Sequence, residues 1–288
     1  MLTLRRGIAR TGWVSLAPWS AFFAFLAIYS LFNPSSVAAG PFEDAFAAYG
    51  RRDYTTALQL FRPLANQGDP NAQFNLALMY SNGRGVPQDY AEAAKWFRLS
   101  ADQGNASAQA NLGNMYSNGW GVPQDDVTAW IWYSLAADGG NVAGQFNLGT
   151  FYDTGRGLPH SYPNEAVKWY RLAADQGDDV AQFNLGTMYE NGRGVLQNYV
   201  EAAKWFLKAA NQGNADAQFN LGRLYGLGDG VPQNVVVGHM WLNLSAVKGD
   251  PTASKLRDDL ARLMTPEQVA EAQRLAREWK PTVSHPVQ

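Results

Sequence analysis

The sequence of 288 residues contains no cysteine, which excludes a disulfide framework, thiolate metal sites and a cysteine nucleophile. Histidine is scarce, and the three histidines are His160, His239 and His285. No two of them stand at the spacing of a metal-binding pair such as H-x-x-x-H. Phosphate-binding loops, the G-x-S-x-G nucleophile and S-x-x-K with its partner motifs are also absent. We therefore predict no catalytic residue, no metal site and no cofactor.

Acidic residues are missing from residues 1–39, a segment that combines three arginines with a mostly apolar run over residues 13–32. A basic start, an apolar core and the small residues SSVAAG follow the order of an export signal, with cleavage expected after Ala38 or Ala39. The apolar run also approaches the roughly 20 residues that span a bilayer, so an uncleaved membrane anchor is the alternative. The small-residue cleavage site favours removal.

Basic residues are in the minority once that segment is removed. The loss of Arg5, Arg6 and Arg10 leaves 20 Lys and Arg against 25 Asp and Glu, a formal charge near −5. Because such a surface repels phosphate backbones, nucleic acid is not an expected partner. The signal predicts export to the periplasm of a bacterial cell or secretion from it, with membrane attachment only if the segment is not cleaved.

What the sequence does contain is one phrase that returns five times, with spacings of 36, 36, 37 and 36 residues. Its copies are NLALMYSNGRGV from Asn75, NLGNMYSNGWGV from Asn111, NLGTFYDTGRGL from Asn147, NLGTMYENGRGV from Asn184 and NLGRLYGLGDGV from Asn220. A period of this length predicts a solenoid of stacked units, none of which buries its apolar face alone.

Each unit is predicted to hold two helices. In the first helix, apolar residues recur at steps of three and four, and a glycine such as Gly83 follows where the helix ends. In the second, Asp89 is expected to cap the amino end and Glu92 to complete a capping box. The predicted organisation is a divergent unit over 41–71, five units over 72–107, 108–143, 144–180, 181–216 and 217–252, closing helices over 253–280 and a loose tail over 281–288.

Stacking the units aligns two aromatic columns, which we assign to the core between neighbouring helices. One column is Tyr80, Tyr116, Tyr152, Tyr189 and Tyr225. The other is Trp96, Trp132, Trp169, Trp205 and Trp241. A third column holds small residues, which indicates close approach of two helix backbones. Its members are Ala77, Gly113, Gly149, Gly186 and Gly222.

The paired glycines near the end of the phrase resemble a phosphate-gripping loop, because Arg84, Arg156 and Arg193 stand between them. Trp120 and Asp229 occupy the same place in the other two units, and a phosphate cradle would not exchange its cation for a carboxylate. We therefore assign the glycines to the turn and expect the residue between them to be free to vary.

The phrase NLGxMYxxGxGVxxDYxxAxxWxxxAAxxG resembles the Sel-one-like repeat, a relative of the tetratricopeptide repeat, over five units from Ala72 to about Thr252. The resemblance implies an all-α, right-handed α/α superhelical solenoid of stacked helix-turn-helix repeats, which acts as an adaptor and holds other proteins in a concave groove. It also implies that some exported relatives carry disulfide-linked helix pairs and that a few are β-lactamase-like or bind penicillin. This chain lacks the cysteines of that subgroup.

The leading hypothesis is a non-enzymatic scaffold that binds another protein or a peptide of the cell envelope through the exposed side of the first helices, where residues vary between units. The predicted contact residues are Leu78, Ser81, Asn114, Ser117, Thr150, Asp153, Thr187, Glu190 and Arg223. Trp120 is the predicted aromatic anchor. Two alternatives stay open, a cell-envelope hydrolase that acts on peptidoglycan or β-lactams and a structural protein held by an uncleaved amino terminus.

Overall fold

The computed structural model describes residues 40–249 and 251–282, which form fourteen helices and no strand. The first helices of successive pairs are α2 (Pro41–Gly50), α4 (Pro70–Asn82), α6 (Ala106–Asn118), α8 (Val142–Thr154), α10 (Asp179–Asn191), α12 (Ala215–Leu227) and α14 (Pro251–Ala261). The second helices are α3 (Tyr54–Asn66), α5 (Tyr90–Ala101), α7 (Asp126–Asp138), α9 (Pro163–Asp175), α11 (Tyr199–Asn211), α13 (Val235–Ala246) and α15 (Pro266–Glu278). The predicted all-α solenoid of stacked helix pairs is confirmed.

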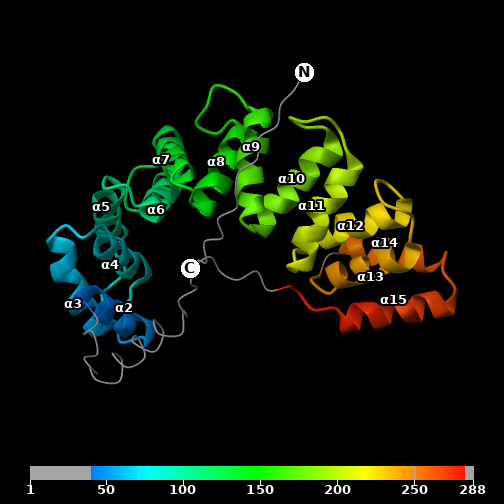
Figure 1. Cartoon of the computed structure of the whole chain (residues 1–288), viewed down its shortest axis with the longest axis horizontal. Coiled ribbons are helices and arrows are strands. Elements are labelled where there is room, and N and C mark those ends of the chain that lie inside the picture. The colour runs from blue at the N-terminus through cyan, green and yellow to red at the C-terminus, as the bar shows by residue number, and fades with distance from the viewer. Residues whose placement is uncertain (1–39, 250, 283–288) are drawn as a thin grey trace, which may run out of the picture.

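The pairs stack into an open arc, with α2 and α3 at one end and α14 and α15 at the other (Figure 1). From α2 to α13, the two helices of a pair pack against each other, and each second helix packs against the first helix of the next pair. The first helices α6 and α8 also contact each other, which consecutive second helices do not do to the same extent. The first helices therefore line the inner side of the arc, and in Figure 1 α4 and α6 lie inside α5 and α7.

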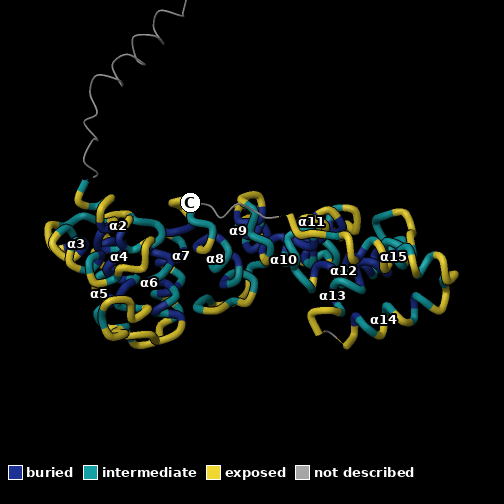
Figure 2. Tube along the Cα trace, turned by 90° about the horizontal axis from the view of Figure 1, so that it is seen from below, coloured by how far each residue is buried: buried dark blue, intermediate teal, exposed yellow. Residues whose placement is uncertain are grey.

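Buried residues run along the whole stack and do not gather at one centre (Figure 2). Each interface between units takes a tryptophan from the later unit, as where Trp132 packs among Phe97 of the preceding pair, Leu112 of its own pair and other buried residues. Trp205 and Trp241 fill the corresponding places further along. Because these rings join one unit to the next, no unit can bury its own apolar face without a neighbour.

The tyrosine column is half-buried and fixes the same interfaces through its hydroxyl groups. Arg62 donates a hydrogen bond to the hydroxyl of Tyr80 at 3.0 Å, and Arg98 donates to that of Tyr116 at 3.1 Å. In each case the arginine lies 18 residues earlier, on the second helix of the preceding unit. The aromatic columns therefore serve the packing between units, as the sequence predicts.

The small residues of the third column make room for aromatic side chains. A Cβ atom at Gly113 would lie 2.7 Å from the ring of Tyr133, and one at Gly186 would lie 2.7 Å from the ring of Phe206. The expected close approach of two backbones is found at Gly222, whose Cβ would lie 3.0 Å from the carbonyl oxygen of Gly238. The expectation was wrong for the other glycines, because a ring on the second helix fills the space that a side chain would take.

Helix caps follow the sequence closely. The Asp89 side chain accepts hydrogen bonds from the backbone N–H groups of Ala91 and Glu92 at 2.9 and 3.0 Å, which stabilises the start of α5. The expected capping box does not form there, because the Glu92 carboxylate pairs with Lys95 at 2.9 Å. The capping box of α15 is present, with Thr265 and Gln268 exchanging both hydrogen bonds.

The C-terminal end of the stack departs from the repeating arrangement. Helices α14 and α15 each pack against α13 and make almost no contact with each other, unlike the two helices of any earlier pair. Ala272 and Ala276 of α15 are buried, while Arg274 on its other side forms ion pairs with Glu271 and Glu278 in water. This polar outer side suits the last element of an open stack.

The proposed export signal lies outside the described residues, as do the residues of the tail from 283 onward. Over residues 40–249 and 251–282, no helix has both the length and the apolar character needed to cross a bilayer.

Candidate functional site

The second glycine of each turn allows two units to touch. A Cβ atom at Gly85 would lie 2.6 Å from the carbonyl oxygen of Tyr54, and one at Gly157 would lie 2.7 Å from that of Asp126. Both residues that are approached begin the second helix of the preceding unit. The glycines therefore serve the joint between units as well as the turn itself.

The residue between the paired glycines reaches back to the preceding unit. Arg84 donates a hydrogen bond to the hydroxyl of Tyr49, and its guanidinium lies 5.7 Å from the centre of the Tyr54 ring. In the next unit, Trp120 stacks on Tyr90 with ring centres 5.8 Å apart. The side chain at this position therefore contacts the preceding unit where it is arginine or tryptophan. The expectation that the position is free to vary stays a prediction.

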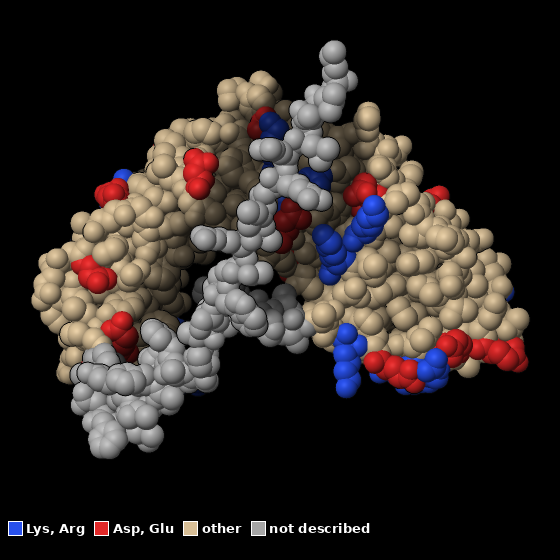
Figure 3. Space-filling view, in the orientation of Figure 1, with Lys and Arg blue, Asp and Glu red and all other residues tan. Residues whose placement is uncertain are grey.

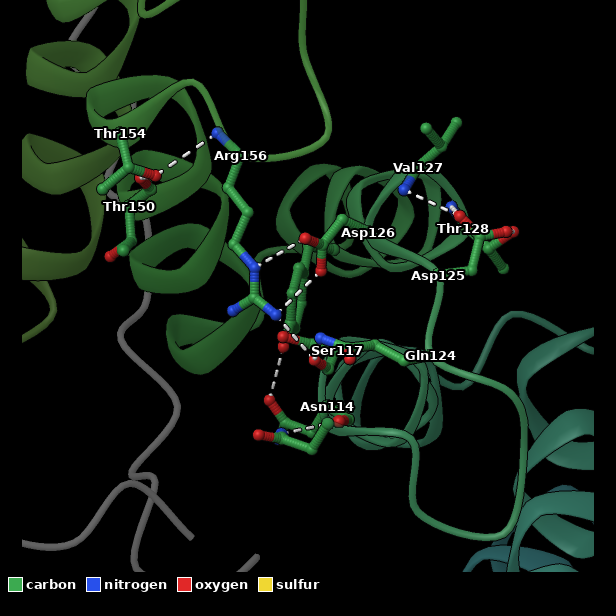
Figure 4. A network of polar contacts seen from close by, with 12 residues as sticks. Asn114, Ser117, Gln124, Asp125, Asp126, Val127, Thr128, Thr150, Thr154 and Arg156 are labelled. Carbon is green, nitrogen blue, oxygen red and sulfur yellow. Dashed lines mark hydrogen bonds and ion pairs between the residues drawn. The ribbon is translucent and has the colours of Figure 1, made fainter.

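Arg156 makes the most extensive of these contacts (Figure 4). Its Nε donates to Oδ2 of Asp126 at 2.8 Å, and its terminal nitrogen lies 2.8 Å from Oδ1 of the same residue. The terminal nitrogen also donates to the carbonyl oxygen of Ser117 at 2.6 Å. The turn after α8 is thereby tied both to the start of α7 and to the end of α6.

Further along the stack, similar pairs connect consecutive first helices. Arg193, in the turn after α10, donates to the carbonyl oxygen of Asp153 at 2.6 Å and lies 3.2 Å from its Oδ1. Arg223 on α12 forms an ion pair with Glu190 on α10. Burial raises the pKa of Asp153, and the charge of Arg193 opposes that shift. Blue and red atoms of such charged residues show in the hollow of the arc in Figure 3.

Hydroxyl and amide groups continue the row toward α6. The Tyr133 hydroxyl donates to Oδ1 of Asn114 at 2.7 Å, and the Tyr170 hydroxyl donates to Oγ1 of Thr150 at 3.1 Å. Burial raises the pKa of both tyrosines to about 12, so they are neutral donors at physiological pH. The Asn147 amide, on α8, also donates to Oδ1 of Asn114 at 3.3 Å.

We call this row the inner face, because its members lie where first helices meet across the stack. It consists of Asn114, Ser117, Thr150, Asp153, Thr187, Glu190 and Arg223. Ser117 is buried, and the other members are half-buried. Leu78 and Ser81 occupy the same positions on α4, where Leu78 packs against the core and the Ser81 hydroxyl donates to the Leu78 carbonyl at 3.1 Å.

A small depression opens on the inner face between α8, α9 and α10. Its volume is about 150 Å³, and it is lined by Asp153, Tyr170, Phe183, Asn184, Thr187, Met188, Asn191 and Arg193. The Thr187 hydroxyl is held by the Phe183 carbonyl at 3.1 Å, and Asn191 donates to the Thr187 carbonyl at 3.0 Å. The depression is therefore pre-formed, with an ion pair on one side and polar groups of α10 on the other.

Trp120 lies in the turn after α6 and contacts Tyr90 at the start of α5. One side of its ring stacks on Tyr90, yet 47% of the residue remains exposed. An indole held in place on one side and open on the other loses little freedom when a partner covers it.

The spacing of residues in the sequence contains a signal for the contacts between units. Three of the residues between paired glycines stand 30 positions after a residue that they contact, so Arg84 lies over Tyr54, Trp120 stacks on Tyr90 and Arg156 pairs with Asp126. An aromatic ring opposite an aromatic ring, and a cation opposite a carboxylate, would have identified the joint.

Groups typical of catalysis do not assemble in the described part of the chain. No cluster of three His, Asp or Glu residues could hold a metal ion there. His160 lies against the ring of Tyr162, with ring centres 4.2 Å apart, and His239 is buried on α13. Asp125 and Asp178, members of two acidic doublets, cap α7 and α10.

The fold and the inner face define a curved stack of helix-pair repeats with a polar concave side. The Sel1 repeat family matches residues 47–69, 70–105, 106–141, 142–178, 179–214 and 215–250, so this chain belongs to the Sel1 repeat family. The last five matches begin two residues before the five units that the sequence predicts. No curated protein matches the chain.

Two solved structures resemble this one over most of its length. A Sel1 repeat protein from Oxalobacter formigenes is 28% identical, with a TM-score of 0.71 over 86% of this chain and 100% of that chain. A protective antigen present in uropathogenic Escherichia coli strains, which displays an SLR fold, is 29% identical, with a TM-score of 0.57 over 83% of this chain and 60% of its own.

Proposed function

We propose that this chain is a non-enzymatic scaffold that binds a segment of another protein along the inner face. Sel1 repeat proteins are generally scaffolds for protein interactions. The observation that carries the proposal is the continuous row of half-buried polar groups from Asn114 to Arg223, which crosses four first helices on the inner side of the arc. Such a row offers a donor or an acceptor at each unit, in step with the repeat.

The charges of the row indicate what kind of segment fits. Arg193 and Arg223 are each opposed by a carboxylate, so the inner face has no excess of one sign. Because the pairs are half-exposed, a partner's own charge can exchange with one member while the other stays compensated. We therefore expect a polar segment of mixed charge, seated with one side chain in the depression beside Thr187.

Two charge-reversal variants test this proposal. One changes a residue of the inner face, and the control changes a residue on a second helix. Glu190→Lys places two cations together on the inner face, whereas Glu201→Lys breaks the exposed pair with Lys204 on the second helix α11. A partner is first captured with a photo-crosslinker at Thr187, and its affinity for each variant is then measured. We expect binding to weaken roughly tenfold or more for Glu190→Lys and to stay unchanged for Glu201→Lys. Equal effects of the two reversals would contradict the proposal.

We further propose that the protein is exported to the cell envelope and that its partner resides there. The support is the order of basic, apolar and small residues in the first 39 positions. The mass of the exported protein tests this, because cleavage leaves a chain that begins at Ala39 or Gly40. A protein that retains its first 39 residues in the membrane would instead be an anchored one.

A further inference from the structure

A series of buried glutamines joins consecutive units of the stack. The series consists of Gln73, Gln109, Gln145, Gln182 and Gln218, one near the start of each first helix from α4 to α12. Each donates its Nε2 to the carbonyl oxygen of an alanine eight residues earlier, at 3.0 to 3.4 Å. This bond fixes the amide group and leaves its Oε1 as a buried acceptor that needs a donor.

For Gln73, Gln145 and Gln182, a glutamine from the next turn supplies that donor, whereas Gly139 stands at the corresponding position for Gln109. Gln103 donates its Nε2 to Oε1 of Gln73 at 2.8 Å and to the carbonyl oxygen of Gly68 at 3.0 Å. One carboxamide thus satisfies two acceptors across the joint between units. The same pair of bonds is made by Gln176 to Gln145 and Gly140 at 2.8 and 3.2 Å, and by Gln212 to Gln182 and Gly177, both at 2.9 Å.

The last unit has the acceptors without the donor. Lys248 stands where the next donating glutamine would be, and it is exposed. Oε1 of Gln218 is buried and has no hydrogen-bond partner among the described residues. Gly213 is the counterpart of Gly68, Gly140 and Gly177, and no side chain of the described residues donates to its carbonyl oxygen in the way seen at those three glycines.

The turn that carries Lys248 has the same backbone geometry as the turn that carries Gln103. The N–H of Lys248 donates to the Ser245 carbonyl at 3.0 Å, and the N–H of Gln103 donates to the Ser100 carbonyl at 3.2 Å. A glycine with positive φ follows in both cases, at 95° for Gly249 and 86° for the other turn. The backbone of this turn would place a glutamine side chain as in the earlier turn. The donor is therefore missing because residue 248 is lysine.

A cavity of about 540 Å³ lies at this place, between the ends of α12 and α13 and the segment after α15. Gln218 and Gly213 line it, together with apolar walls from Leu244, Val247, Trp279 and Pro281. Lys248 and Arg277 are the charged residues of its lining, so the cavity carries positive charge and no acidic group.

We propose that this cavity binds a glutamine side chain of a partner polypeptide, whose carboxamide takes the place of the missing glutamine of the series. Its amide nitrogen donates to Oε1 of Gln218 and to the carbonyl oxygen of Gly213, as Gln103 does further back. The apolar walls receive the methylene groups, and Lys248 and Arg277 favour acidic residues beside the glutamine. This site is separate from the inner face.

Substitution of Lys248 tests whether the cavity is a carboxamide site, without any ligand. Lys248→Gln restores the donor on the same backbone, whereas Lys248→Met removes the charge equally and provides no donor. We expect the thermal midpoint of Lys248→Gln to exceed that of Lys248→Met by about 2–4 °C, because one buried acceptor becomes satisfied. Equal midpoints would overturn the proposal, since the cavity would then not select a carboxamide.

Titration of the purified full-length protein with three probes tests the ligand and its source. The probes are the blocked peptide acetyl-Asp-Gln-Asp-amide, the same peptide with methionine in place of glutamine, and free L-glutamine. We expect the glutamine peptide to bind roughly tenfold or more tightly than the other two probes, and Lys248→Gln to abolish this binding by filling the site. Lys248→Met should retain the preference for glutamine over methionine.

Two results of the titration would overturn the proposal. Equal affinity of the glutamine and methionine peptides would show that no carboxamide is recognised. Free L-glutamine that binds as tightly as the peptide would show that the cavity takes a small molecule and not a polypeptide.

Discussion

The interior of the stack and its C-terminal end are built from the same phrase and differ in how completely their groups are paired. Between α4 and α11, three of the four buried glutamines accept from a glutamine of the next unit, and the bridging Arg156 and Arg193 pair with carboxylates and carbonyl groups. From α12 onward, Oε1 of Gln218 and Nδ1 of His239 are buried without hydrogen-bond partners among the described residues, and cavities of about 340 and 540 Å³ flank α13. Within residues 40–249, the interior has no unpaired glutamine oxygen of this kind, although the indole nitrogens of Trp130 and Trp205 are buried without partners there. Buried polar groups of one repeat find hydrogen-bond partners in the following repeat. Helices α14 and α15 do not form a further repeat that could supply them.

The largest expected effect is the loss of unfolding free energy when a buried tryptophan is truncated. Trp205→Ala truncates a buried ring between two complete units and should cost about 3–5 kcal/mol of unfolding free energy. Trp241→Ala removes an equally buried ring beside α15, which is held on one side only and can shift into the space, so about 2–3 kcal/mol is expected. Chemical denaturation measures both, and a larger loss for Trp241→Ala would reverse the comparison.

The next effect concerns the joints between units. In Gly194→Ala the new Cβ overlaps the backbone of Pro163, and the residue keeps a positive φ, so a loss of about 2–4 kcal/mol is expected. Gly177→Ala has the same type of φ and nothing near its Cβ, so it should cost only about 1–2 kcal/mol. Equal losses in the two variants would mean that backbone conformation, and not contact between units, explains the glycine.

A smaller effect is expected on the pH dependence of stability, which should differ between the interior and the C-terminal end. Burial lowers the pKa of His239, and the nearby Arg257 lowers it further, while Asp258 opposes the shift. The folded state therefore binds a proton less readily than the unfolded state, so stability is full above the unfolded pKa of about 6.5 and falls as the pH drops below it.

The variant His239→Leu should lose less stability than the wild type between pH 7.5 and pH 5.5, as measured by thermal midpoints. His160→Leu is the control, because His160 is exposed in a loop of the interior. If both variants follow the wild type, the pH dependence of the C-terminal end has another origin.

The smallest effect is expected for the ion pairs of the inner face. Arg193→Ala removes a half-exposed partner of Asp153 and should cost no more than about 1 kcal/mol of stability, because solvent screens such a pair. Denaturation curves in low and high salt check this, and the difference from wild type should shrink as salt is added. A loss as large as that of Trp205→Ala would mean that the pairs hold the stack together.

Several features of the fold could be predicted from the sequence because they repeat. The period gave the stacked helix pairs, and recurrence of Trp205 and its equivalents placed them in the core. Local chemistry predicted the caps at Asp89 and Thr265, since a side chain and a backbone N–H three positions later are always close at a helix start. Gly186 is predicted to allow close approach of two helix backbones. The structure shows that the ring of Phe206 takes the space instead.

The contact residues of the inner face were harder to predict, since their surroundings come from other units. The sequence predicts Asp153 and Glu190 as contact residues because these positions vary between units. The structure places each of them opposite an arginine of the following unit. The sequence predicts Ser117 on an exposed surface, but it is buried at the end of α6, and its backbone carbonyl accepts a hydrogen bond from Arg156 of the following unit. Variation within the row therefore reflects pairing between neighbours as well as openness to a partner.

The sequence by itself determined the period, the two helices of each unit and the apolar stripes that make a unit dependent on its neighbours, because these follow from local propensity and spacing. Only the tertiary structure decided which groups meet across a joint, how the stack curves and where it leaves acceptors unpaired. Those outcomes depend on residues about 30 positions apart that come together only when one unit packs against the next.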